Sequence, residues 1–238
     1  MSTRLDVFKV TYFDTKGISF CNLEQPSINI CYLAGQFCYQ QLMVIKDNKM
    51  ANQQVNIDTK HLREGDIIFT SIPNYLYQKI QKGTKSKTSH VGILFKKHNQ
   101  WWVAESKIPF AKYSTLNDFV ARSKDHWFEI KRVKQHLNQA QIEQLKKSAE
   151  QRMGGCYDLS FNYHSNKLFC SKFVYDVFKE ACDIEIGELE SFNALIEKNP
   201  SSLTLFWRVW FCGFIPYSTV TVTPQSQLMD RKLECVCG

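Results

Sequence analysis

The sequence predicts an α+β fold that contains a β-hairpin and a helix with a cysteine at its start. Residues 89–106 form two apolar runs around a short polar turn, which is typical of a β-hairpin. Residues 168–181 carry apolar side chains at helical spacing. Strands and helices are expected in groups rather than in regular strand–helix alternation, and this favours α+β over a parallel α/β sheet.

The composition is that of a folded protein with a basic surface. The chain has 238 residues, which fits one domain with an extension or two small domains. A hydrophobic fraction of 44% supports a substantial core and argues against disorder. The formal net charge of +7 comes from lysines that are spread along the chain. No nucleic-acid-binding motif accompanies them, so we expect no nucleic-acid partner.

The predicted elements begin after residue 60. Residues 1–60 show no sustained hydrophobic period, and we expect them to form an N-terminal extension of unknown role. Residues 61–238 are expected to form the main domain. Its pattern predicts a turn and strand over 63–69, a helix over 75–82, the hairpin of 89–106, a helix over 116–122, a strand over 127–133, a helix over 138–153 capped by Asn138, and the helix that begins at Cys170.

Cys170 is a candidate nucleophile. The apolar stripe of its predicted helix consists of Phe173, Val174, Val177, Phe178 and Ala181. Cys170 lies three residues before Phe173, so it begins the helix on the buried side. Unpaired backbone N–H groups and the helix dipole favour an anion there, and this biases the thiol toward the nucleophilic thiolate. The alternative is a buried cysteine that packs as a small apolar side chain.

The predicted hairpin brings a histidine and a glutamate together. With the turn centred between Lys97 and His98, His90 lies directly opposite Glu105 on one face of the sheet. A carboxylate held against an imidazole fixes its tautomer and orientation, as a general base requires. A loop of odd length would place the two side chains on opposite faces. The alternative role for this pair is a surface ion pair.

The cysteines predict a reducing compartment. The chain has nine cysteines, and its first fourteen residues contain charges and no apolar signal-peptide segment. We therefore expect a cytoplasmic protein with free thiols. Cys235 and Cys237 form a Cys-x-Cys pair without a second pair at metal spacing. A frayed terminus is the expectation and a zinc site the alternative, so no metal or cofactor is predicted.

The longest apolar stretch, residues 203–216, is aromatic. It is too short to span a bilayer and carries Arg208 at its centre. Packing over the core or over the mouth of an active site is the expectation. The alternative is an interfacial helix that contacts a membrane through the stretch from Phe206 to Phe214.

Four short motifs in a fixed order resemble a known family. They are Gly65-Asp66-Ile-Ile-Phe, Ser89-His90-Val-Gly-Ile, Val103-Ala-Glu105 and Phe169-Cys170-Ser-Lys-Phe-Val. Together they resemble the circularly permuted NlpC/P60 cysteine hydrolases, and more narrowly the YebB/YiiX-like branch. The resemblance covers about residues 62–232. It implies a papain-like fold, with an antiparallel sheet packed against the cysteine-bearing helix and the histidine preceding the cysteine in the chain.

The resemblance also assigns roles to these residues. It implies that Cys170 is the nucleophile, that His90 acts first as base and then as acid, and that Glu105 orients the imidazole. Tyr157 is implied as a residue that lines the substrate pocket. His164, six residues before Cys170, competes for the role of base, but its loop position gives it no fixed orienting partner.

These observations lead to a hydrolase that cleaves an amide bond, peptide or N-acyl, through a thioester on Cys170. An LRAT-like acyltransferase that uses a lipid or amine acceptor is the second hypothesis. A non-catalytic binding module on the same scaffold is the third, and a ligand site for an amino-group compound at Glu105 is a fourth. The expected substrates are small peptides, cell-wall fragments and N-acyl or lipid amides. The oligomeric state is not predicted.

Overall fold

The computed structural model describes residues 9–14, 17–22, 55, 57–199 and 204–236. Most of the predicted extension over residues 1–60 therefore lies outside the described residues, as does Cys237 of the Cys-x-Cys pair. The division of the chain at residue 60 stays a prediction. Within the described ranges, no helix is long and apolar enough to cross a membrane.

The main element is a six-stranded sheet in which every pair of neighbouring strands is antiparallel. Its strands are β3 (Ile67–Thr70), β4 (His90–Lys97), β5 (Gln100–Ser106), β6 (Ala111–Thr115), β7 (Phe128–Val133) and β10 (Leu233–Cys235). They lie in the order β10-β7-β3-β4-β5-β6. The predicted strands 63–69 and 127–133 and both strands of the hairpin are confirmed, and they form the centre of this sheet.

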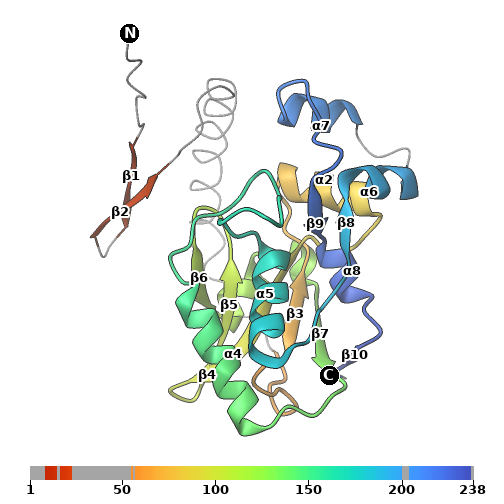
Figure 1. Ribbon diagram of the computed structural model, residues 1–238. Coiled ribbons are helices and arrows are strands. Elements are labelled where there is room, and N and C mark those ends of the chain that lie inside the picture. The colour runs from red at the N-terminus through yellow and green to blue at the C-terminus, as the bar shows by residue number, and fades with distance from the viewer. Residues whose placement is uncertain (1–8, 15–16, 23–54, 56, 200–203, 237–238) are drawn as a thin grey trace.

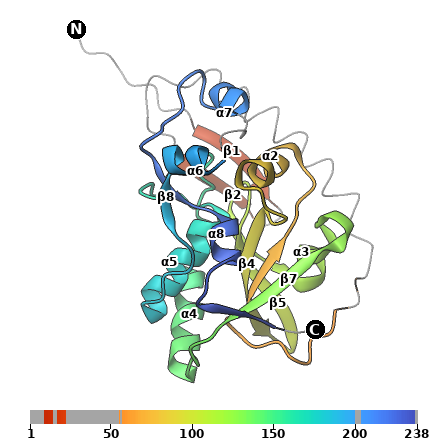
Figure 2. The same ribbon diagram turned by 90° about the vertical axis from the view of Figure 1, so that its right-hand side faces the viewer.

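Two helices cover one face of the sheet, and a third covers the other. Helices α4 (Gln139–Gln151) and α5 (Cys170–Cys182) lie on one side of the strands, and α3 (Leu116–Ala121) lies on the opposite side (Figure 2). Alternating strand residues explain this division. Phe69, Val91 and Ile93 pack in the core against α5, whereas their neighbours Ile68 and Leu94 pack in a second core against α3.

The helix boundaries follow polar caps. Asn138 caps α4 as predicted, and its side chain forms a reciprocal capping box with Gln141. Asn74 caps α2 (Tyr75–Thr84), and Thr115 caps α3. The predicted starts of α2, α3 and α4 therefore agree with the observed caps and first residues. Helix α2 continues two residues beyond its predicted end.

The C-terminal part of the chain builds a layer next to the start of α5. It contains β8 (Leu189–Ser191), α6 (Phe192–Lys198), α7 (Thr204–Trp210), β9 (Val220–Val222) and α8 (Pro224–Leu228). Strands β8 and β9 form a separate two-stranded antiparallel sheet. In both views α7 lies above α2 and α6, at the end of the molecule away from β10 (Figure 1).

Several elements were not predicted from the sequence, among them β8, β9, β10, α6 and α8 of the C-terminal part. A hairpin of β1 (Lys9–Asp14) and β2 (Gly17–Asn22) lies inside the predicted extension. Strand β6 adds an edge to the main sheet beyond β5. A single 3₁₀ turn, η1 (Lys124–His126), connects α3 to β7.

Candidate active site

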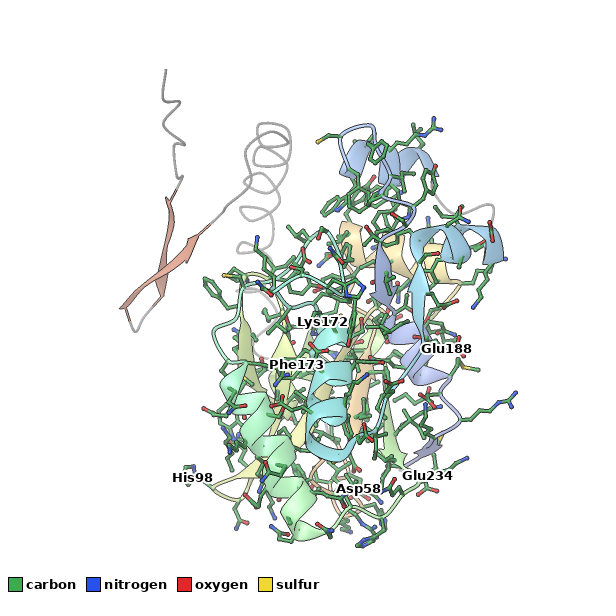
Figure 3. All side chains as sticks on the ribbon, viewed as in Figure 1. Asp58, His98, Lys172, Phe173, Glu188 and Glu234 are labelled. Atoms are coloured by element: carbon green, nitrogen blue, oxygen red, sulfur yellow. The ribbon has the colours of Figure 1, made fainter. Side chains whose placement is uncertain are left out.

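The turn of the β4–β5 hairpin determines which side chains share a face. His98 and Asn99 both have positive φ, 49° and 64°, and they form a two-residue turn between the paired residues Lys97 and Gln100. Figure 3 labels His98 at this turn, far from the start of α5. The predicted turn centre between Lys97 and His98 is therefore wrong by one residue, because the left-handed pair begins at His98.

This correction moves the pairing by two residues and keeps the faces. Leu94 pairs with Val103 and Ile93 pairs with Ala104, so His90 does not lie directly opposite Glu105. A shift of two positions preserves the face on which each side chain lies. His90 and Glu105 are thus diagonal neighbours on one face, a separation that long side chains can bridge.

Gly92 makes room for this diagonal contact. A Cβ atom on Gly92 would lie 3.5 Å from the Cβ of Glu105 and only 2.4 Å from Cγ1 of Val103. Without a side chain at position 92, β5 approaches β4 closely and the Glu105 carboxylate has space to turn toward position 90. Position 92 of the His-Val-Gly motif therefore requires glycine, because a side chain there would collide with β5.

The histidine and the glutamate form a fully buried pair. Nε2 of His90 lies 2.5 Å from Oε2 of Glu105, and both side chains have no exposed surface. The alternative role as a surface ion pair is therefore wrong. Nδ1 of His90 has no hydrogen-bond partner among the described residues, although it is buried. One ring nitrogen is thus held by the carboxylate, and no hydrogen bond joins the other to the Cys170 thiol or to another described residue.

Two further residues hold the carboxylate, and sequence reasoning missed both. Ser114 on β6 donates to Oε1 of Glu105 at 2.5 Å, and Nη2 of Arg122 donates to the same oxygen at 2.6 Å. Arg122 follows the last residue of α3, a position that the predicted helix over 116–122 already contained. Ser114 had no signal, because β6 was not predicted.

The charges around the pair fix its protonation. Burial by itself raises the pKa of Glu105, but the Arg122 charge and the His90 hydrogen bond outweigh it and hold this pKa well below its usual value. Burial lowers the pKa of His90, against the opposing effect of Glu105. An ionised Glu105 only accepts hydrogen bonds, so Nε2 of the neutral imidazole carries the proton and Nδ1 presents its lone pair.

Two aromatic rings enclose the imidazole. The Tyr77 ring of α2 meets His90 edge-on, with centroids 5.6 Å apart, and the Phe119 ring of α3 lies at 5.4 Å. The imidazole therefore packs against aromatic rings from two different helices. These contacts explain why burial dominates the pKa of His90, and they fix the orientation of the ring.

Cys170 is the first residue of α5, as predicted, and its position is anchored from the C-terminal layer. Oγ of Ser171 donates to the carbonyl of Val222 at 2.7 Å, and Gln227 donates to the carbonyl of Ser171 at 2.9 Å. The residue before the helix, Phe169, supplies no side-chain cap. The first-turn amides of α5 are therefore not occupied by a capping side chain and remain suited to hold a negative charge.

The thiol of Cys170 lies beside the start of β4. The backbone N–H groups of Ser171 and Val91 and the side chain of Tyr157 all interact with it. Val91 directly follows His90 in the chain, so the sulfur contacts the strand residue next to the predicted base. Tyr157, the predicted pocket residue, is buried next to the thiol.

The expected thiolate is not the resting state. Burial raises the pKa of Cys170 to about 11, although the surrounding N–H groups and Tyr157 act in the opposite direction. The side chain is only 3% exposed, and loss of hydration outweighs the effect of the helix terminus. At neutral pH the cysteine is a neutral thiol, and it requires a base to become a nucleophile.

The other candidate residues lie apart from this centre. His164 is exposed in the aromatic loop and packs edge-on against Tyr163. Cys235 is exposed, with its thiol 3.8 Å from Glu129. The expectation that all thiols are free is wrong for Cys156, which is disulfide-bonded. The order of cysteines along the chain does not tell which sulfurs the fold brings together.

The sequence was compared with models of known protein families. The sequence model described as "Permuted papain-like amidase enzyme, YaeF/YiiX, C92 family" matches residues 61–237. The chain belongs to the permuted papain-like amidase family. The resemblance in the motif order and the α+β fold with an antiparallel sheet are thereby confirmed, and the permuted amidase family accounts for a histidine that precedes the cysteine.

Two bacterial relatives support the assignment to the permuted papain-like amidases. An uncharacterised protein, YiiX of Escherichia coli K12, is 26% identical over 162 residues, which cover 68% of this chain and 79% of the relative. The crystal structure of a protein described as metalloprotein yiiX, from Escherichia coli O157:H7, superposes with a TM-score of 0.69 at 26% identity. The similarity covers 74% of this chain and 97% of the other.

The described residues were also compared with the donor set of a metal site. Among them, no group of three or more His, Cys, Asp or Glu side chains lies close enough together to hold a metal ion. This part of the chain does not fit a resident metal, and the chemistry proposed below uses its side chains and backbone amides.

Proposed function

We propose that this protein is a thiol-dependent amidase in which Cys170 is the nucleophile, His90 the base and acid, and Glu105 the residue that orients the imidazole. One observation carries the proposal. The imidazole of His90 is fully buried, and Glu105 holds its Nε2, while Nδ1 has no hydrogen-bond partner among the described residues. The next residue of the strand, Val91, contacts the Cys170 thiol through its backbone N–H. Family membership supports the reaction class, because the family is one of amidases.

The acylation step begins from a neutral pair. Nδ1 of His90 removes the proton from the Cys170 thiol as the sulfur forms a bond to the amide carbonyl carbon. The first-turn amides of α5 stabilise the negative charge that develops on the carbonyl oxygen. The imidazolium then gives its proton to the amide nitrogen, the carbon–nitrogen bond breaks, and the amine leaves. Glu105 stabilises the imidazolium throughout because it stays ionised.

The deacylation step restores the enzyme. His90 removes a proton from a water molecule as the water oxygen attacks the thioester carbonyl. The carbon–sulfur bond then breaks, and the imidazolium returns the proton to the thiolate. The products are a carboxylic acid, an amine and the original neutral thiol.

Three variants of the full chain test this proposal. Cys170→Ala and His90→Ala should abolish amide cleavage, and Glu105→Gln should reduce kcat by about 10³–10⁴-fold, because a neutral amide no longer fixes the tautomer or stabilises the imidazolium. Circular dichroism of each variant reports whether the fold is retained. Undiminished cleavage by folded Cys170→Ala would show that another group is the nucleophile.

Acyl transfer is the second candidate function. Cys170 lines an apolar cavity that would shield a thioester from water, and this favours transfer of the acyl group to an amine or lipid acceptor. Incubation of one acyl amide with and without an added amine distinguishes the two. A transferase forms the new amide faster than it forms the free acid.

We further propose a peripheral membrane contact through the segment Phe206–Phe214. Leu205, Val209 and Phe214 are 76%, 72% and 78% exposed on and after α7, while the inner face of this helix packs against the molecule. Exposed apolar side chains on a protein of net charge +7 suit an anionic lipid surface. Sedimentation with anionic vesicles, compared between the natural chain and Leu205→Ser/Val209→Ser, tests this contact. The cytoplasmic location expected from the sequence stays a prediction.

A further inference from the structure

A charged groove lies beside β8 and α8. Its volume is about 1280 Å³, including the open mouth. Figure 3 labels Glu188, one of its lining residues, on the side of the molecule where Figure 1 shows β8 and α8. The lining comes from four segments of the chain, within residues 83–85, 187–190, 195–199 and 223–232. Pockets that bind small molecules have volumes of about 300–1,000 Å³, so the groove is large enough for one.

Hydrogen bonds between these segments fix the walls of the groove. Asn199 is buried and donates through Nδ2 to the carbonyl oxygen of Gly83 at 2.9 Å, which fastens the end of α6 to the end of α2. The carboxylate of Asp230 accepts from the backbone N–H of Gly187 at 2.6 Å, which fastens the turn after α8 to the turn before β8. Because these contacts lie within the protein, the groove is formed before a ligand enters, and binding requires little ordering of its walls.

The carboxylates of the groove already have cationic partners from the groove itself. Glu190 pairs with Lys198, and Oδ2 of Asp230 lies 3.2 Å from Nζ of Lys232. Glu188 lies 4.0 Å from Nζ of Lys198, and its side chain is 75% exposed, so water screens its charge. The carboxylates therefore oppose the entry of an anion only weakly.

Two further cations of the lining form no ion pair with any residue that the structure describes. Lys85 ends α2 in the left-handed conformation, with φ 50°. Arg231 lies in the turn between α8 and β10. Both side chains are exposed, so an anion that binds them does not have to break an existing pair. The groove thus carries an excess of positive charge that comes from two separate parts of the chain.

From these charges we infer that the groove is a second binding site, separate from Cys170, for a compound that carries a phosphate group bound by Lys85 and Arg231. A guanidinium donates two parallel hydrogen bonds to phosphate oxygens, and an ammonium supplies a compact positive charge. A phosphate monoester carries up to two negative charges and can satisfy both cations, whereas a single carboxylate supplies one. Cys170 does not line the groove, so the inference does not rest on the proposed amidase function.

Calorimetric titration of the full chain tests this inference. The probes are glycerol 3-phosphate, inorganic phosphate and, as the uncharged comparison, glycerol. We expect a Kd of about 1 mM or lower for glycerol 3-phosphate at low ionic strength, because two charge-assisted contacts are made. The Kd should rise with added salt, and glycerol should not bind. Failure of both phosphate compounds to bind would overturn the inference.

A double variant removes both cations and keeps the backbone. Lys85→Asn/Arg231→Gln should raise the Kd for glycerol 3-phosphate at least about tenfold, and asparagine tolerates the left-handed conformation of position 85. Lys87→Asn/Lys147→Gln removes two exposed lysines outside the groove and is the matched control for net charge. Its Kd should stay within about twofold of the natural value. Equal weakening in both double variants would overturn the inference, because overall charge would then account for binding.

Two further measurements separate this site from the nucleophile and identify the source of the phosphate. Cys170→Ala should bind glycerol 3-phosphate with the natural Kd, and loss of binding in this variant, with its fold retained, would overturn a site separate from Cys170. Both soluble compounds and lipid headgroups carry phosphate, and sedimentation with phosphatidylcholine vesicles that contain phosphatidic acid distinguishes them. Sedimentation that Lys85→Asn/Arg231→Gln loses assigns the groove to a lipid headgroup. Sedimentation that this variant leaves unchanged assigns the groove to a soluble phosphate compound.

Discussion

Arg122 donates a hydrogen bond from Nη2 to Oε1 of Glu105 at 2.6 Å, and His90 holds the other oxygen of the same carboxylate. The guanidinium of Arg122 therefore keeps Glu105 ionised, and the ionised Glu105 determines the tautomer of the His90 imidazole. Arg122 also lies over the Phe119 ring, 5.2 Å from its centroid, and this ring packs on His90. One residue at the end of α3 thus supports both the carboxylate and the aromatic wall of the site.

Loss of Arg122 should destabilise the protein and the site together. Arg122→Met leaves the buried Glu105 without its positive partner, which costs about 3 kcal/mol when one member of a buried pair is removed. We expect this loss in the free energy of unfolding measured with urea, and a lower kcat. Arg122→Lys, which keeps the charge, is the matched control and should recover part of both. An unchanged unfolding midpoint in Arg122→Met would contradict the role given to this contact.

Gly92 should not accept even one additional carbon. A Cβ at this position would lie 2.4 Å from Cγ1 of Val103 and 2.9 Å from the carbonyl oxygen of Ala104. Gly92→Ala must therefore push β5 away from β4, at a cost of about 1–3 kcal/mol, and separate Glu105 from His90. The measurements are thermal unfolding and kcat. Gly83→Ala, where the added carbon has space, is the control and should be neutral or stabilising.

The pH profile should show a base that stays neutral in mildly acidic solution. The pKa of His90 is lowered from 6.5, chiefly by burial, so the acid limb of kcat/KM should have its midpoint below pH 6.5. Because the unfolded chain takes up a proton that folded His90 does not, its contribution to stability is complete above pH 6.5 and declines as the pH falls below it. Glu105, whose pKa is also lowered, adds a further loss below pH 4.5. An acid limb centred above 6.5 would be inconsistent with a buried neutral imidazole.

The resting thiol should react slowly with small reagents. Cys170 is 3% exposed and its pKa is raised to about 11, whereas Cys212 and Cys235 are exposed. At pH 7.5, iodoacetamide should therefore modify Cys212 and Cys235 at least about tenfold faster than Cys170, as followed by peptide mass spectrometry. An acyl chloromethyl ketone, which resembles the proposed amide substrate, should modify Cys170 first. Preferential reaction of Cys170 with iodoacetamide would mean that the resting enzyme contains a thiolate.

The sequence was sufficient to predict the secondary-structure elements that carry His90, Glu105 and Cys170. Hydrophobic periodicity located α5 and its first residue, and the alternation of the hairpin determined that residues 90 and 105 share a face. That conclusion survived an error in the turn, because a shift by two residues does not exchange the faces of a strand. The alternation of side chains along a strand was therefore sufficient to predict that His90 and Glu105 share a face of the sheet.

Relationships that depend on tertiary packing were beyond the sequence. Ser114 reaches Glu105 only because β6 pairs with β5, and a strand of five residues carries a weak pattern. At Cys170 the helix terminus lowers the pKa of the thiol and burial raises it, and which effect is larger depends on how many atoms surround the sulfur. The sequence does not show this number, so it predicted a thiolate where the structure favours a neutral thiol. The cavity has the same origin, since its walls come from segments more than 100 residues apart.

The most direct measurement is rapid-quench mass spectrometry of the full chain mixed with an acyl amide that it cleaves. The account predicts that the peptide containing Cys170 gains the mass of one acyl group of this substrate during turnover. It also predicts that Cys170→Ala shows neither the adduct nor amine release, and that His90→Ala accumulates no adduct on the same timescale. Amine release at the natural rate from Cys170→Ala, or an acyl group found on another residue, would contradict it.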